Sequence, residues 1–212
     1  MGRYSKGILG PFSGKVGTVV GSSWNGIDYM RSLPKPSSKA PTEAQTIQRV
    51  RMALAVGFLK PISPLLTQGF KRVAGNSSGF NVATSQVVKE AIAGVYPDFT
   101  IDYSKVLISR GELTGPWNAT VASAAGAVNV GWTDNTGSGI AKGTDKAILL
   151  VYNEAKGQYV YDMAGADRSA ATDSLIMPAD FIGDQVHVWM AFVSADGKLI
   201  STSQYIGMTE VM

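Results

Sequence analysis

The side chains that could carry out chemistry are few and widely spaced in this 212-residue chain. The chain has no cysteine and one histidine, so thiol catalysis, disulfides and thiolate metal sites are excluded. The histidine, His187, alternates with Val186 and Val188 in a strand-forming run. General acid–base catalysis and metal binding need a second partner of suitable type, and there is no second histidine. We therefore expect His187 to be an ordinary histidine on the surface of a sheet.

Two weaker motifs also fall short of a site. The segment Gly10–Val16 has the glycines and lysine of a phosphate-binding loop, but too few residues separate the glycines and Val16 stands where a hydroxyl belongs. Aspartates recur between strand-forming runs without the spacing of a calcium loop or of an acid–base pair, and we expect them to start turns; they are Asp134, Asp145, Asp162, Asp167, Asp173, Asp180 and Asp184. The sequence thus predicts no catalytic residue, cofactor or metal, and a protein that is not an enzyme.

The charges are sorted by position along the chain. Residues 1–75 carry 11 lysines and arginines against 2 acidic residues, a net charge of +9, whereas residues 76–212 carry 8 against 14, a net charge of −6. Such asymmetry indicates that the two ends meet different partners, or each other. Between residues 49 and 72 we expect a basic face, which could neutralise phosphates or dock on an acidic surface of another copy. Its residues are Arg49, Arg51, Lys60, Lys71 and Arg72.

The first 40 residues predict a glycine-rich arm with a β-hairpin. Strand-forming runs at 15–22 and 27–32 flank an Asn-Gly pair that suits a tight hairpin turn. A two-stranded hairpin is marginal alone in water and leaves open edges, so we expect the arm to join a sheet of its own chain or of a neighbour. Its candidate self-association residues are Lys15, Val16, Val19, Val20, Trp24, Asn25, Gly26, Ile27, Tyr29 and Arg31. Residues 34–41 then predict a stiff, proline-rich linker.

Residues 41–95 predict a helical segment. Residues 42–45 fit a capping box, and the apolar stripe of the helix that follows consists of Ile47, Val50, Leu54 and Phe58. Pro64 is placed to open a second helix. A third helix is expected over residues 83–93, with Gly94 as its C-cap.

Residues 96–212 predict an immunoglobulin-like or fibronectin-type-III-like β-sandwich. Short strand-forming runs separated by turn residues are typical of that fold; they cover 105–109, 127–133, 147–153, 158–163, 174–177, 185–193 and 203–210. Alternation places Val128, Val130 and Trp132 on one inner face, and Val186, Val188, Met190 and Phe192 on the other. The fold class we expect is therefore α+β, mainly β, with an arm and linker at 1–40, helices at 41–95 and a sandwich at 96–212.

Three stretches together resemble a known family. They are GILGPFSGKVGTVVGSSWNGIDYMRSLP at 7–34, PTEAQ at 41–45 with the two arginines after it, and SADGKLISTSQYIG at 194–207. The chain resembles an uncharacterised family of about 210 residues, a domain of unknown function common in Bacteroidota. The resemblance implies the arm, helix and sandwich, and it supplies no catalytic or ligand residues. Similar Gly/Trp-rich openings occur in phage-related proteins, which implies a component of a particle or filament.

These observations favour a non-enzymatic structural subunit that forms homo-oligomers, as a filament, a ring or a phage-like particle. Only 17% of residues are charged, which leaves a weakly solvated surface that a partner subunit would cover. One alternative is a nucleic-acid-associated protein that uses the basic half. Another is a carbohydrate- or surface-binding module with Trp117 and Tyr159 as glycan contacts. The sequence shows neither a secretory signal nor a run of about 18 apolar residues, so we expect cytoplasmic synthesis and no membrane span.

Overall fold

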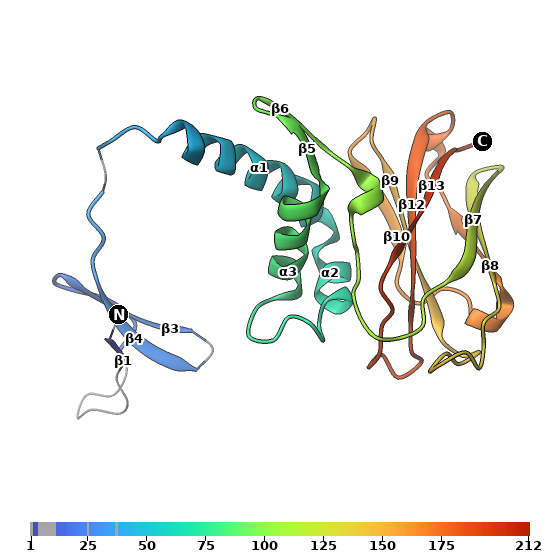
Figure 1. The fold of residues 1–212 in the computed structure, drawn as a ribbon, viewed down its shortest axis with the longest axis horizontal. Helices are drawn as coiled ribbons and strands as arrows, with labels where there is room; N and C mark the ends of the chain where they lie inside the picture. The colour runs from blue at the N-terminus through green and yellow to red at the C-terminus, as the bar shows by residue number, and fades with distance from the viewer. Residues whose placement is uncertain (1, 4–11, 25, 37) are drawn as a thin grey trace. The chain divides into compact units, whose positions relative to one another are not determined.

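The computed structural model describes residues 2–3, 12–24, 26–36 and 38–212, and the chain divides into two compact units between Thr42 and Glu43 (Figure 1). The first unit is a small sheet, and the second combines helices with a β-sandwich. The expected α+β, mainly β class is confirmed. The segments predicted at 41–95 and 96–212 both belong to the second unit.

The first unit is a four-stranded sheet with the order β1-β4-β3-β2. Its strands are β1 (Gly2–Arg3), β2 (Gly14–Val16), β3 (Val19–Trp24) and β4 (Ile27–Ser32). The predicted hairpin is confirmed, because Trp24 pairs with Ile27 and Gly26 has a φ of 75°. Asn25, the other residue of that turn, lies outside the described residues. The run at 15–22, expected as one strand, forms two instead, because Gly17 at φ 58° turns the chain so that Val16 pairs with Val19.

The helices open the second unit. They are α1 (Glu43–Leu59), the 3₁₀ turn η1 (Lys60–Ile62), α2 (Ser63–Gly69), α3 (Gly79–Gln86) and the π-helical turn η2 (Val87–Ala91). Of the stripe predicted on α1, Phe58 is buried and the other three residues are half-buried. Proline does stand in the first turn of α2, as expected.

The third helix differs from its prediction at both ends. It begins earlier, at Gly79, where the Ser78 hydroxyl caps it by accepting a hydrogen bond from the Asn81 backbone N–H at 3.2 Å. Its helical turns end at Ala91, and Ile92 starts a hairpin of β5 (Ile92–Val95) and β6 (Asp98–Ile101). Gly94 is therefore a strand residue and not a helix cap. Its φ of 85° places the carbonyl oxygen of Asp98 only 2.3 Å from where a Cβ would stand, so that only glycine fits.

Seven strands form the two antiparallel sheets of a sandwich. One sheet has the order β11-β8-β7 and contains β7 (Trp117–Ala124), β8 (Ala127–Thr133) and β11 (Thr172–Ile176). The other has the order β10-β9-β12-β13 and contains β9 (Lys146–Asn153), β10 (Gln158–Asp162), β12 (Gln185–Val193) and β13 (Gln204–Glu210). Short 3₁₀ turns connect the elements: η3 (Tyr103–Lys105), η4 (Arg168–Ala170) and η5 (Ala179–Phe181).

The strand predictions differ in quality. Those at 127–133 and 185–193 match β8 and β12 at both ends, and four others match β9, β10, β11 and β13 to within two residues. The strand predicted at 105–109 is wrong. There the backbone N–H groups of Ile108 and Ser109 donate to the hydroxyl of Ser203 and not to a neighbouring strand. Strand β7 was not expected.

The four-stranded sheet of the sandwich is covered on both faces. The strands β7, β8 and β11 lie on one side and the helices on the other (Figure 1). The predicted sandwich core is confirmed, since Val186, Val188, Met190 and Phe192 pack in one cluster with the inward face of β8. The alternate residues of β12, from Trp189 to Val193, pack in a second cluster with Phe58 and Leu59 of α1. Central strands that are buried on both faces have nearly continuous apolar sequences, as β9 and β12 do.

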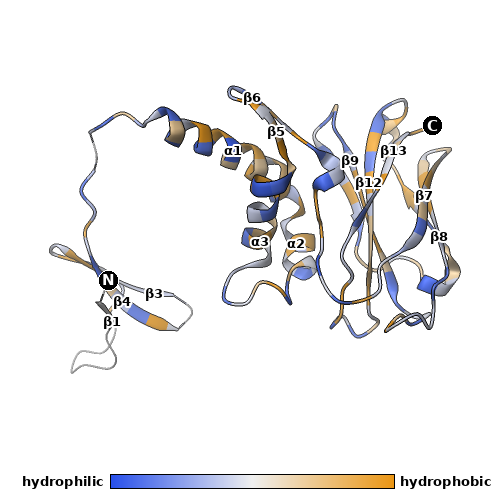
Figure 2. Cartoon of the chain, viewed as in Figure 1, coloured by the Kyte–Doolittle hydropathy of each residue, from blue (hydrophilic) through white to orange (hydrophobic). Residues whose placement is uncertain are grey.

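One helical stretch, Glu43–Gly69, is long and apolar enough to cross a membrane by length and composition. It is not one straight helix, because the 3₁₀ turn at Lys60–Ile62 separates α1 from α2. Hydrophilic and hydrophobic residues alternate along α1 (Figure 2). The buried residues of the stretch, including Leu59, Ile62 and Leu66, belong to the core shared with the sheet. Packing on that sheet accounts for its apolar composition.

Candidate binding surfaces

The sheet of the first unit, here called the arm sheet (β1 to β4), has almost no core of its own. Gly21 is the one buried residue among the described residues 12–36. The carbonyl oxygen of Phe12 passes 2.2 Å from where a Cβ of Gly21 would stand, which explains why glycine is needed there. Several apolar side chains elsewhere in the arm sheet are exposed, with Val16 at 64% and Trp24 at 56%, while Val20 and Met30 are half-buried. The arm sheet therefore presents apolar surface that a typical domain would bury.

The structure gathers the predicted self-association residues into this one sheet. Lys15 and Val16 lie on β2, three others on β3 and three on β4, and the described ones are exposed or half-buried. Among the described strands, β2 pairs with β3 alone and therefore lies at an edge of the arm sheet. The phosphate-loop motif is not followed by a helix, because Gly14–Val16 forms strand β2. Gly10 and Pro11 of the motif lie outside the described residues.

The predicted basic face is not one uniform patch. Arg49, Lys60 and Lys71 are exposed. Arg72 lies 3.9 Å from Glu112, with both side chains largely exposed. Arg51 is partly buried, donates from Nη2 to the Val88 carbonyl at 2.7 Å and lies over the Phe99 ring at 5.9 Å. Arg51 therefore ties α1 to the elements beside it and is not a free surface cation.

A groove of about 490 Å³, here called the aromatic groove, opens between α1, β6 and the turn from β9 to β10. Five rings line it, those of Phe58, Phe99, Tyr103, Tyr152 and Tyr159. Phe58 meets Tyr152 and Tyr159 edge to face, with centroids 5.1 and 5.7 Å apart, while those two tyrosines stack at 4.6 Å. The Tyr159 hydroxyl donates to the Phe58 carbonyl at 2.6 Å. The rings hold one another in place, which fixes the shape of this wall.

Glu154 is the one charged residue that lines the aromatic groove. Its Oε1 accepts a hydrogen bond from the Tyr103 hydroxyl at 3.1 Å, and its side chain remains 62% exposed. Burial raises the pKa of Tyr103, and the neighbouring Tyr152 and Glu154 raise it further, so this hydroxyl remains a donor at neutral pH. The carboxylate is thus oriented by its neighbours and still open to a cation.

His187 lies behind Glu154, and the expectation of a surface histidine is wrong. Its side chain is only 10% exposed, because the residues around η3 cover this face of β12. Its ring lies 4.1 Å from that of Tyr103, Nδ1 lies 2.9 Å from the Tyr205 hydroxyl, and Nε2 lies 3.6 Å from Glu154. Burial lowers the pKa of His187, and Glu154 opposes that effect only in part. His187 is therefore neutral at physiological pH and supports the aromatic wall.

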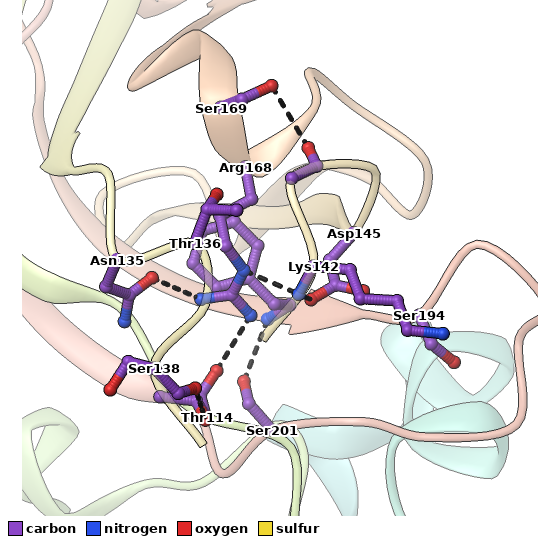
Figure 3. Close-up of polar contacts among 12 residues, drawn as sticks. Thr114, Asn135, Thr136, Ser138, Lys142, Asp145, Arg168, Ser169, Ser194 and Ser201 are labelled. Carbon is purple, nitrogen blue, oxygen red and sulfur yellow. Dashed lines mark hydrogen bonds and ion pairs between the residues drawn. The ribbon is translucent and has the colours of Figure 1, made fainter. Parts of the chain in front are cut away.

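A second polar cluster surrounds the buried guanidinium of Arg168 in η4 (Figure 3). Its Nε donates to Asp145 at 3.1 Å, Nη1 to the Asn135 side chain at 2.6 Å and Nη2 to the Thr114 carbonyl at 2.8 Å. The guanidinium also lies 3.8 Å from the centroid of the Phe192 ring. Asp145, expected to be a solvated turn residue, is instead buried in an ion pair. Arg168, Asp145 and Asn135 are buried, and the cluster joins three loops to the sandwich core.

The two rings suggested as glycan contacts do not come together. Trp117 lies on β7 of the three-stranded sheet and is 49% exposed. Tyr159 lies on β10 of the other sheet and packs against the helix layer. The described part of the chain also holds no group of three or more His, Asp or Glu side chains that could bind a metal ion.

A model of a family of unknown function, DUF6266, matches residues 11–207. The chain belongs to DUF6266. A search of curated proteins finds no significant match. Membership of DUF6266 therefore establishes the family and assigns no activity.

Sequence reasoning missed the two polar features of this DUF6266 protein. Asn135 and Asp145 lie in the loop between β8 and β9, and strands β9 and β10 separate them from Arg168, so the sequence gives no local signal of this ion pair. Glu154 follows β9 directly, and the tyrosines of β9 and β10 alternate toward the same side as His187. That alternation is visible in the sequence, but the helices that turn this face into a groove could not be placed on it.

Proposed function

We propose that this DUF6266 protein is a non-enzymatic structural subunit that assembles with copies of itself through the arm sheet, as a component of a filament, a ring or a phage-like particle. A Bacteroidota origin and a relationship to phage proteins, as the N-terminal motif suggests, are part of this proposal. The observation that carries it is the exposed apolar surface of the arm sheet. Ordered strands with one buried residue between 12 and 36 have little to hold them in isolation.

A neighbouring subunit would supply the missing burial. Covering one large apolar side chain completely contributes about 1.5–3 kcal/mol, and the arm sheet exposes several, including Val16, Trp24 and Ile27. The outer edge of β2 adds backbone donors and acceptors that a strand of another copy could pair. Contact between unlike surfaces gives a ring if the rotation closes and a filament if it does not.

The test compares the intact chain with a variant lacking residues 1–40. We expect the intact chain to form higher oligomers in size-exclusion chromatography with light scattering, and ordered particles or filaments by electron microscopy. The shortened chain should remain monomeric. If both chains remain monomeric at high concentration and low salt, the proposal is wrong.

Point variants give a sharper comparison. Val16→Lys and Trp24→Lys each place a charge at an exposed apolar position of the arm sheet, one on either face, and should weaken assembly strongly. Ile176→Lys is the matched control, because Ile176 is 79% exposed but lies on β11 of the sandwich. Equal assembly of all three variants would contradict a role for the arm sheet.

One observation favours a second candidate function, binding to nucleic acid. Lys15, Arg31, Lys35 and Lys39 are all exposed, while Asp28 is the one acidic residue between positions 12 and 42. Filter binding of DNA and RNA across a salt series tests this candidate. Phosphate contacts require affinity to fall steeply as salt rises, so weak binding with a flat salt dependence would remove it.

A further inference from the structure

The aromatic groove and the linker that follows the arm sheet have complementary chemistry. The groove offers ring surfaces and one carboxylate, with no lysine or arginine among its lining residues. The linker offers prolines and cations. Rings that line a shallow groove, with an acid at its rim, suit proline-rich segments that carry a basic residue.

The linker has the properties of such a ligand. Residues 33–41 contain Pro34, Pro36 and Pro41 together with Lys35 and Lys39. The described residues of this stretch are exposed and lie in neither helix nor strand. Each proline fixes its own φ and favours an extended residue before it, so little conformational entropy is lost when the segment is bound.

We propose that the aromatic groove binds the linker, residues 33–41, of a second copy of the chain, with the prolines against Tyr103 and Tyr159 and a lysine against Glu154. This inference rests on the proposed function and names the surface that receives the arm of the neighbouring subunit. The exposed carboxylate of Glu154, already held by the Tyr103 hydroxyl, is ready to accept the ammonium group.

Small residues keep the groove open on its helical side. Gly57 of α1 lines the groove, and a Cβ added there would meet nothing within 4 Å. A larger side chain at this position can therefore fill the groove without a clash at its base. Leucine also has a higher helix propensity than glycine, so Gly57→Leu should fold.

The first test titrates a synthetic peptide of residues 31–42 into the full-length chain by calorimetry. We expect saturable binding to the natural chain. Binding should be at least about tenfold weaker with Gly57→Leu, which fills the groove, and with Glu154→Gln, which keeps the Tyr103 hydrogen bond but removes the charge. Glu112→Gln, a change of the same kind at a side chain that is 78% exposed elsewhere, should bind like the natural chain.

A peptide carrying Lys35→Glu and Lys39→Glu is the matched control on the ligand side and should not bind. Equal affinity of the natural peptide for the Gly57→Leu, Glu154→Gln and natural chains would overturn the inference. So would equal affinity of the natural chain for both peptides.

The second test separates binding between copies from binding within one copy. Glu154→Lys in one chain, and Lys35→Glu with Lys39→Glu in another, should each reduce assembly of the full-length protein when alone. A mixture should recover it, because the lysine of one groove meets the glutamates of the other linker. A mixture that stays dissociated overturns the inference.

The failure of this inference can be distinguished from the failure of the proposed function. If deleting residues 1–40 abolishes assembly while Gly57→Leu and Glu154→Gln assemble normally, the arm sheet assembles the protein and the groove does not receive the linker. If the intact chain never assembles but the peptide binds the groove with the expected variant profile, the groove is a linker site and the structural-subunit proposal is wrong.

Discussion

Arg168 and Asp145 show how one buried pair can hold several loops. Arg168 is fully buried and Asp145 is 1% exposed. Burial lowers the pKa of Arg168, and the adjacent Asp145 carboxylate opposes this shift. Because the guanidinium is bonded at all three nitrogens and stacked on Phe192, its desolvation is offset by contacts from two loops, 106–116 and 134–145, and from strand β12.

This arrangement predicts a large effect of removing one partner. Asp145→Ala leaves a buried, uncompensated cation and should lower the free energy of unfolding by about 3–5 kcal/mol. The double variant Asp145→Leu with Arg168→Met should lose much less than the sum of Asp145→Leu alone and Arg168→Met alone, because no charge remains buried. Urea denaturation of these four variants and of the natural chain measures both quantities. Additive losses would show that the two side chains are not coupled.

His187 predicts a pH dependence that can be assigned to one side chain. Its pKa is lowered in the folded protein, so below the ordinary value of about 6.5 the unfolded chain binds more protons than the folded one. Stability should therefore fall as the pH drops from about 7.5 to about 5.5. His187→Gln should lose less stability than the natural chain over that window. The same slope in both proteins would assign the effect to other groups.

The carboxylates do not interfere in that window. The hydroxyl of Ser194 and the backbone of Lys198 lower the pKa of Asp196 to about 2, and the pKa values of Asp102, Asp134 and Asp184 are lowered as well. A carboxylate with a lowered pKa contributes stability that is present above about pH 5 and is lost as the pH falls through its unfolded value of about 3.9. These four aspartates therefore do not add to a loss of stability between about pH 7.5 and about pH 5.5.

Among the elements, those with strong hydrophobic alternation could be predicted from the sequence. The apolar faces of β8 and β12 pack in the sandwich core, and their ends were predicted to the residue. Strand β7 was missed because its run of Asn, Ala, Thr and Ser has little apolar contrast and no residue of it is fully buried. At 105–109 Val106 and Ile108 are buried, but the hydroxyl of Ser203, and not a neighbouring strand, accepts from the backbone.

The two candidate surfaces differ in how far the sequence predicts them. The arm hairpin follows from the Asn-Gly pair and its flanking strands, which are local signals. The aromatic groove needs α1, β6 and the turn after β9 to meet, and those elements are about 50 residues apart along the chain. Local patterns specify each element separately. They do not specify that the helices cover the outer face of the four-stranded sheet and so enclose the groove.

For the whole molecule, the division between the units predicts where a protease cuts first. Lys35 precedes a proline, which trypsin does not cleave efficiently, whereas Lys39 precedes Ala40 in the exposed linker. The helices share a core with the sheet of β9, β10, β12 and β13, and among the described residues the buried members of that core begin at Ala55. We therefore expect a stable product that begins at Ala40 and unfolds at nearly the same temperature as the intact chain. Mass spectrometry and calorimetry measure both, and early cuts within 43–212 would contradict a separate second unit.

Assembly should protect that same bond. If residues 33–41 lie in the groove of a neighbouring copy, the Lys39–Ala40 bond is buried in the assembled protein and exposed in the monomer. Cleavage should therefore slow as the protein concentration rises, and it should stay fast at every concentration for Gly57→Leu, whose groove is filled. A rate that is the same for both proteins at high concentration, where the natural chain is assembled, would mean that the arm sheet makes the contact while the linker remains in solvent.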